Sequence, residues 1–228
     1  MSAFRASVIS AAWPRVDVTV LVSPHAPKTG VYATRRGSLD GFGIRGSEAE
    51  IPTDPELAEE LRAAWGADVI DEPLDHGIVV PLLLRPFSAP VVACGFAEVT
   101  GPGGCHPSDV LADARSLAEA VGAFASAHRV LFVANAHSSA ALSSRAPLMT
   151  RSEGTRLHDL LFDAAKRGTV GDLAEVTAAD WHAAGACGVG PLVALAHLLP
   201  KAVVTGFHDC SPFGVGYLSV TFDPVGAE

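Results

Sequence analysis

Histidine and cysteine are the residues of this chain that could bind a metal ion or move a proton near neutral pH. Four of the nine histidines stand beside apolar runs: His25, His76, His137 and His208. His25 lies in "SPHAP", directly after the apolar run "VDVTVLV", and the two prolines restrict the backbone around it. An ordinary loop histidine is the alternative, but the pattern favours a metal ligand or an active-site residue.

His76 stands in "LDHGIVVPLLL", between Asp75 and Gly77, at the expected start of a strand. A neighbouring carboxylate can select the tautomer of an imidazole, as carboxylates beside metal-bound histidines do. Adjacent side chains often point apart, so a structural role for His76 stays equally open. His137, in "VANAHSSAAL", follows an apolar run and precedes two serines, and a simple loop histidine is again the alternative.

The four cysteines are Cys94, Cys105, Cys187 and Cys210. They lie far apart and form no CxxC pair, so neither a disulfide framework nor a zinc knuckle is expected. Cys187 lies in the glycine-rich stretch "AAGACGVGPLVAL", where a helix is expected to begin. A helix N-terminus lowers a thiol pKa, so Cys187 could be a nucleophile or a soft metal ligand. A small thiol buried in a tight turn is the other interpretation.

The composition is that of a compact globular protein, with 49% apolar and 18% charged residues. The net charge of −9 argues against nucleic-acid or anionic-membrane partners, which require clustered Lys and Arg. No run approaches the roughly 20 apolar residues of a membrane span. Pro14, Arg15 and Asp17 interrupt the N-terminal apolar stretch before it could form a secretion signal. We therefore expect a cytoplasmic protein that binds small molecules, and whether it forms a homo-oligomer stays open.

Short runs rich in Val, Ile, Leu and Phe predict buried strands, and apolar residues three to four positions apart predict helices between them. The expected strands are Val18–Val22, Ile78–Leu84, Val91–Ala93, Val130–Ala134, Ala202–Phe207 and Gly216–Phe222. The expected helices are Pro55–Trp65, Ser108–Ala127 with Ser108 as its cap, Arg151–Arg167 and Gly190–Leu199. This alternation predicts one α/β domain over residues 1–228 with a central, mostly parallel sheet flanked by helices. Loops at the carboxyl ends of such strands form the ligand-binding crevice.

Four phrases, "LVSPHAP", "LDHGIVVPLLL", "GACGVGPLVAL" and "PFGVGYLSVTF", occur in this order between Val18 and Phe222. Together they resemble the class III extradiol ring-cleavage dioxygenase superfamily, the LigB-like fold that also contains the Memo-like proteins. The resemblance implies a LigB-like domain and an oxidoreductase that opens the ring of a small aromatic, catecholic substrate. In active members two histidines and a carboxylate hold Fe(II), leaving positions open for substrate and O2. A further histidine acts as acid and base on the bound substrate.

The same resemblance assigns roles to individual residues. His25 is similar to a metal-ligand histidine, and Cys187 falls near the last ligand, where Memo-like members use a cysteine and dioxygenases a glutamate. His76 corresponds to the active-site histidine of "DHG" and, with His137, would position substrate or move protons. Asp75 and His208 are expected to contact the substrate. The implied metal is Fe(II), with zinc or no metal as alternatives.

The chain departs from the family pattern in three places. The stretch "ISAAWPRV" lacks the N-terminal histidine, "NAHSSA" has Ala140 where the acid/base histidine would stand, and "GACGVGP" contains no glutamate. Two functions therefore stay open: a metal-dependent extradiol oxygenase, and a catalytically degenerate Memo-like protein that binds a metal or a small molecule. A cysteine hydrolase using Cys187 and His137 is a third, and it would require a thiol that reacts fast near neutral pH.

Overall fold

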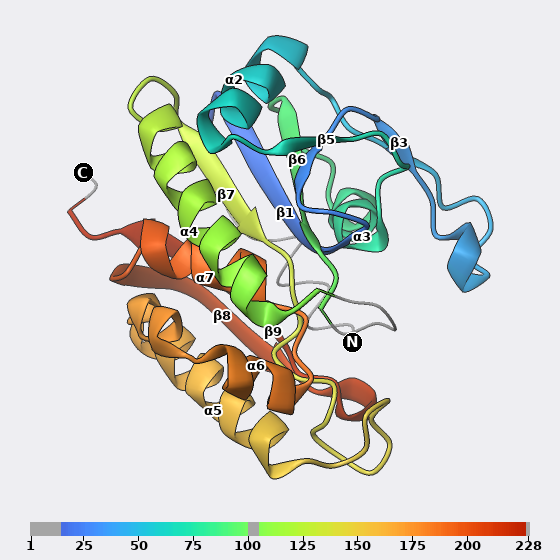
Figure 1. Cartoon of the computed structure of the whole chain (residues 1–228), viewed down its shortest axis with the longest axis vertical. Coiled ribbons are helices and arrows are strands. Elements are labelled where there is room, and N and C mark those ends of the chain that lie inside the picture. The colour runs from blue at the N-terminus through green and yellow to red at the C-terminus, as the bar shows by residue number, and fades with distance from the viewer. Residues whose placement is uncertain (1–14, 100–104, 227–228) are drawn as a thin grey trace.

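A five-stranded sheet forms the centre of the fold in the computed structural model, which describes residues 15–99 and 105–226 (Figure 1). The strand order is β5-β2-β6-β1-β7. The strands are β1 (Val18–Ala26), β2 (Gly30–Tyr32), β5 (Asp68–Ile70), β6 (Val91–Ala97) and β7 (Val130–Ala134). Strand β1 is parallel to β6 and to β7, and β2 is parallel to β5; β2 and β6 pair antiparallel. The predicted class, α/β with a central and mostly parallel sheet flanked by helices, is confirmed.

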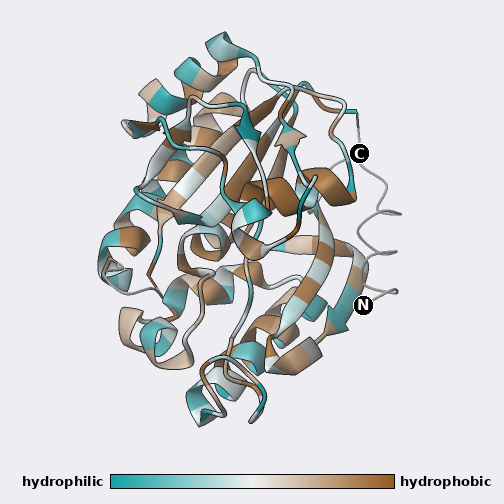
Figure 2. Cartoon of the chain, turned by 90° about the vertical axis from the view of Figure 1, so that its right-hand side faces the viewer, coloured by the Kyte–Doolittle hydropathy of each residue, from teal (hydrophilic) through white to brown (hydrophobic). Residues whose placement is uncertain are grey.

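Both faces of the sheet are covered. Val18, Val20 and Val22 of β1 belong to a large apolar cluster that also contains residues of α2 (Pro55–Trp65), α4 (Pro107–Phe124) and α7 (Val189–Leu198). Leu21 belongs instead to a second cluster, with residues of α3 (His76–Leu84). This burial on both faces explains why β1 reads as a continuous apolar run rather than an alternating one. Figure 2 shows hydrophobic residues gathered on the inner strands and hydrophilic ones on the outer helices and loops.

Smaller elements complete the chain. Strands β3 (Arg36–Gly37) and β4 (Ala49–Glu50) pair with each other, with the short helix η1 (Asp40–Phe42) between them. Helix α5 (Ser152–Arg167), η2 (Val170–Glu175) and α6 (Ala178–Ala184) precede α7, and β8 (Ala202–Cys210), η3 (Pro212–Gly214) and β9 (Tyr217–Pro224) end the fold. Leu157 of α5 and Trp181 of α6 belong to the same large apolar cluster as β1, so these elements share its core.

The prediction of a strand at Ile78–Leu84 is wrong, because this segment lies in helix α3. Asp75 caps the helix by accepting a hydrogen bond from the Gly77 amide at 2.6 Å. The helix buries residues around most of its circumference and has Pro81 within it, so its sequence carries no helical periodicity. A short apolar run of this kind cannot be assigned to strand or helix from periodicity alone.

Three further expectations are corrected in detail. Helix α4 begins at Pro107, with His106 as its cap, because the His106 ring accepts from the Ser108 amide. Strand β1 continues to Ala26 after an irregularity in its pairing with β6, so "SPHAP" is the end of a strand and not a loop. Strands β8 and β9 form a separate antiparallel pair and do not join the central sheet.

Two expectations from the N-terminal sequence concern the missing secretion signal and the stretch "ISAAWPRV". Residues 1–14, on which both largely rest, lie outside the described residues. Within the ranges that the structure describes, no helix has the length and apolar content needed to cross a bilayer.

Candidate functional site

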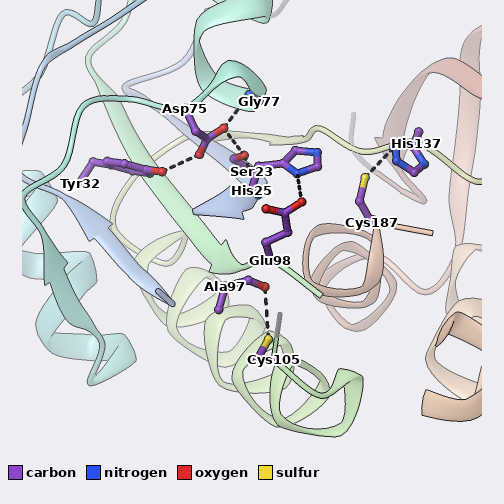
Figure 3. Close-up of polar contacts among 10 residues, drawn as sticks. All are labelled: Ser23, His25, Tyr32, Asp75, Gly77, Ala97, Glu98, Cys105, His137 and Cys187. Atoms are coloured by element: carbon purple, nitrogen blue, oxygen red, sulfur yellow. Dashed lines mark hydrogen bonds and ion pairs between the residues drawn. The ribbon is translucent and has the colours of Figure 1, made fainter. Parts of the chain in front are cut away.

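The carboxyl ends of three neighbouring strands carry chemically active side chains (Figure 3). His25 lies near the end of β1, Glu98 directly follows β6, and His137 follows β7. Because β6, β1 and β7 are adjacent and parallel, these residues meet at one edge of the sheet. His76 joins them from the first turn of α3. We call His25, His76 and His137 the histidine cluster.

The rings of His25 and His76 are in direct contact. Their centroids lie 4.2 Å apart, with the ring planes inclined by 32°. The His25 side chain is only 16% exposed. Burial lowers the pKa of His25, and a charge on His76 would lower it further, while Asp75 and Glu98 oppose the shift. The neutral ring of His25 can therefore accept a proton or a hydrogen bond at neutral pH.

His137 is the most strongly perturbed member of the cluster. Burial, followed by the nearby His25 and His76, lowers the pKa of His137 to about 4. Its Nδ1 atom is buried and has no hydrogen-bond partner among the described residues. A buried polar atom without a partner is uncommon in folded proteins.

Glu98 is a residue of this site that the sequence analysis did not single out. Its Oε1 atom lies 3.7 Å from Nδ1 of His25, and its side chain is 45% exposed. The available signal was a carboxylate directly after the buried run Val91–Ala97, at the carboxyl end of a strand. Phe42 of η1 is a second such residue, since its ring meets the His76 ring edge-on at 5.0 Å.

Cys187 lies beside His137 but is not activated. Its Sγ atom accepts a hydrogen bond from the His137 backbone amide at 3.4 Å, and the residue is 2% exposed. Burial raises the pKa of Cys187 to about 12. The expected lowering of the thiol pKa is therefore wrong, because removal from water outweighs the backbone hydrogen bonds that lower the pKa. Cys187 is a neutral thiol at pH 7, which does not favour a hydrolytic nucleophile.

The two residues expected to contact substrate lie in different places. Asp75 borders the histidine cluster, and its carboxylate accepts hydrogen bonds from the hydroxyls of Ser23 and Tyr32. His208 lies in β8 of the separate antiparallel pair, opposite Ser219. The structure thus brings His25, His76, His137, Cys187 and Asp75 to one region, with His208 on another sheet.

The arrangement of these side chains decides whether they could hold a metal ion. Across residues 15–99 and 105–226, no three His, Cys, Asp or Glu side chains are arranged to share a metal ion. An Fe(II) ion held by three of these side chains does not fit them as they lie.

Comparisons with known proteins bear on the fold and not on the chemistry. No protein-family model matches the chain, and no curated protein matches it. Among solved structures, the chain is similar to the uncharacterized protein JW3007 from Escherichia coli K12, with a TM-score of 0.57 and 16% sequence identity. The match covers 96% of this chain and 90% of that one. At this identity the likeness shows a shared fold alone.

Proposed function

We propose that this chain is a LigB-like, extradiol dioxygenase-type protein whose histidine cluster binds a small aromatic molecule with acidic hydroxyls, such as a catechol. The observation that carries the proposal is the convergence of His25, His76 and His137 at the carboxyl edge of the sheet. These residues come from segments far apart in the sequence, and His25 and His76 lie in two of the phrases on which the family resemblance rests.

The protonation states suit a phenolic ligand. Two imidazoles with lowered pKa values, those of His25 and His137, are neutral at pH 7 and can accept hydrogen bonds from catechol hydroxyls. The Nδ1 atom of His137 has no partner among the described residues, and because it is buried a ligand would reach it only after neighbouring side chains move. The exposed ring of Phe42 beside His76 offers an aromatic surface on which a substrate ring could pack.

A catalytically degenerate, Memo-like binding protein is the second candidate. One observation favours it: the described residues do not assemble a metal site. Ring cleavage in the extradiol class uses iron to bring electrons of the substrate to O2, so a protein without iron would bind the catechol and leave it intact.

We also propose a cytoplasmic location and a small-molecule partner. All four cysteines are free thiols in the structure, which fits a reducing, cytoplasmic location. The net charge of −9 fits a small-molecule ligand better than a nucleic acid.

One experiment tests the proposal and separates its two forms. The purified protein is loaded anaerobically with Fe(II), freed of excess metal and analysed for iron, and O2 uptake is then followed with catechol. Binding of catechol to the metal-free protein is measured in parallel by calorimetry. The variants His76→Ala and His137→Ala should lose binding, whereas His182→Ala, an exposed histidine of α6, should not.

The outcomes point in different directions. Iron retention with catechol-dependent O2 uptake, and a product that contains both oxygen atoms, identifies a ring-cleaving dioxygenase. Catechol binding without O2 uptake identifies the degenerate form. A wild-type protein that neither binds catechol nor consumes O2 with it overturns the proposal.

A further inference from the structure

Short hydrogen bonds connect Asp75 to strands β1 and β2 of the central sheet (Figure 3), and another connects Gly77 to the residue that follows β7. The Ser23 hydroxyl of β1 donates to Oδ1 of Asp75 at 2.6 Å. The Tyr32 hydroxyl of β2 donates to Oδ2 at 2.5 Å. Asn135 directly follows β7, and its side-chain amide (Nδ2) donates to the Gly77 backbone carbonyl at 2.6 Å. The segment that carries His76 is therefore held on both sides.

The Asp75 carboxylate is committed to protein donors. Oδ1 also accepts from the Gly77 amide at 2.6 Å, so both oxygens are engaged. Ser23 is 0% and Tyr32 4% exposed, so their donors cannot turn to water instead. Burial and the adjacent carboxylate raise the pKa of Tyr32, which keeps its hydroxyl protonated as a donor. Oδ1 thus accepts two hydrogen bonds and Oδ2 accepts one from Tyr32.

Gly77 makes the close approach of Ser23 possible. A Cβ atom on Gly77 would lie 2.2 Å from the Ser23 hydroxyl oxygen and 3.0 Å from Oδ1 of Asp75. A side chain there would push Ser23 away from the carboxylate. The three residues of "DHG" thus have distinct local tasks: an anchoring carboxylate, a ring at the cluster, and room for the hydroxyl of β1.

We propose that Asp75 is a positioning residue, anchored by Ser23 and Tyr32, that fixes the His76 ring against His25. His76 is flanked by Asp75 and Gly77, and both neighbours are tied to the sheet, so little freedom remains at its Cα atom. This role is separate from the substrate contact expected of Asp75, which stays a prediction. Its consequence for ligand binding rests on the proposed function, but its consequence for the ring pair does not.

The test uses the full chain and two readouts. The variants Asp75→Asn and Tyr32→Phe each remove part of the network, and Tyr32→Phe is the milder change if Asp75→Asn folds poorly. Asp54→Asn is the matched control, because Asp54 caps α2 through the Glu56 and Leu57 amides, away from the cluster. Imidazole signals of His25 and His76 are recorded by NMR, melting temperatures are measured beside them, and catechol is titrated as the probe.

We expect shifted imidazole signals for His25 and His76 in Asp75→Asn and Tyr32→Phe, and unchanged signals in Asp54→Asn even where its melting temperature falls. Catechol affinity should fall at least about tenfold in the first two variants only. If the wild-type protein does not bind catechol but the variants still shift the imidazole signals, the proposed function is wrong and the positioning role is supported. Unchanged signals in both variants, or full catechol affinity despite shifted signals, would overturn the positioning role.

Discussion

His25 and His76 place their imidazole rings 4.2 Å apart, one from the end of strand β1 and the other from the first turn of helix α3. Two cationic rings at that distance would repel each other strongly in a partly buried site. Together with burial, this repulsion lowers the pKa of His25. This coupling has measurable consequences for each ring.

Replacing His76 should change the acidity of its neighbour. In His76→Gln the second ring can no longer carry a charge, so the pKa of His25 should rise toward its ordinary value. The pKa of His137 should rise in the same variant, because a charge on His76 contributes to its lowering. An NMR titration of the histidine rings measures both values. His182→Gln is the control. An unchanged or lower pKa of His25 in His76→Gln would contradict an electrostatic coupling between the two rings.

The depressed pKa of His137 should make stability depend on pH. The unfolded chain binds this proton near pH 6.5 and the folded chain only near pH 4, so the unfolded state takes up more protons between these values. The contribution of His137 is therefore complete above pH 6.5 and is lost as the pH falls toward 4. It amounts to about 3 kcal/mol, since each pKa unit corresponds to about 1.4 kcal/mol.

Urea denaturation at pH 7 and pH 4 checks this expectation. The loss of unfolding free energy between the two pH values should be smaller in His137→Gln than in the wild type. Carboxylates also titrate in this range, so the difference between the two proteins is the informative quantity. Equal losses in both proteins would mean that His137 is not buried in its neutral form.

Much of the fold could be predicted from the sequence, because hydrophobic runs and caps are local signals. Helix Pro55–Trp65 carries its proline and acidic first turn in the sequence, and the structure has the same bounds. Helix α3 could not be identified, since a helix buried on most sides shows no period and resembles a buried strand. The sequence also does not indicate which distant strands pair with one another. The assignment of β8 and β9 to a sheet of their own could therefore not be predicted.

The candidate site was predictable in part. His25, His76 and His137 stand beside apolar runs in the sequence. In the structure these runs are β1, α3 and β7, and the three histidines lie near one another at their ends. Glu98 and Tyr32 were not identifiable, because their roles depend on which strands are neighbours and in what register. The acidity of Cys187 was expected in the wrong direction, since its burial depends on tertiary packing that a glycine-rich turn does not reveal.

The cysteines should differ sharply in reactivity. Cys94 and Cys187 are buried, and burial raises the pKa of each to about 12, so iodoacetamide at pH 7.5 should leave them unmodified. Cys105 and Cys210 are partly exposed and should be modified first. Mass spectrometry of peptides gives the order, and unfolding in urea should make all four reactive. Fast native modification of Cys187 would revive the cysteine-hydrolase hypothesis.

Adding a methyl group at Gly77 should disturb the anchor of α3. In Gly77→Ala the new Cβ would overlap the Ser23 hydroxyl oxygen, and we expect a loss of about 1–3 kcal/mol in unfolding free energy. Gly122→Ala is the matched control. Its Cβ would meet nothing within 4 Å in helix α4, so it should gain up to about 1 kcal/mol from helix propensity.

A double-mutant cycle shows whether the clash with Ser23 is the cause. Ser23→Ala removes the overlapping oxygen and also one bond to Asp75, so it should destabilise the protein by itself. Once that oxygen is gone, Gly77→Ala should cost less than it does in the wild type, and the two losses should not add. Strictly additive losses would place the effect of Gly77 elsewhere in α3, and "DHG" would then need its glycine for a reason other than the approach of β1.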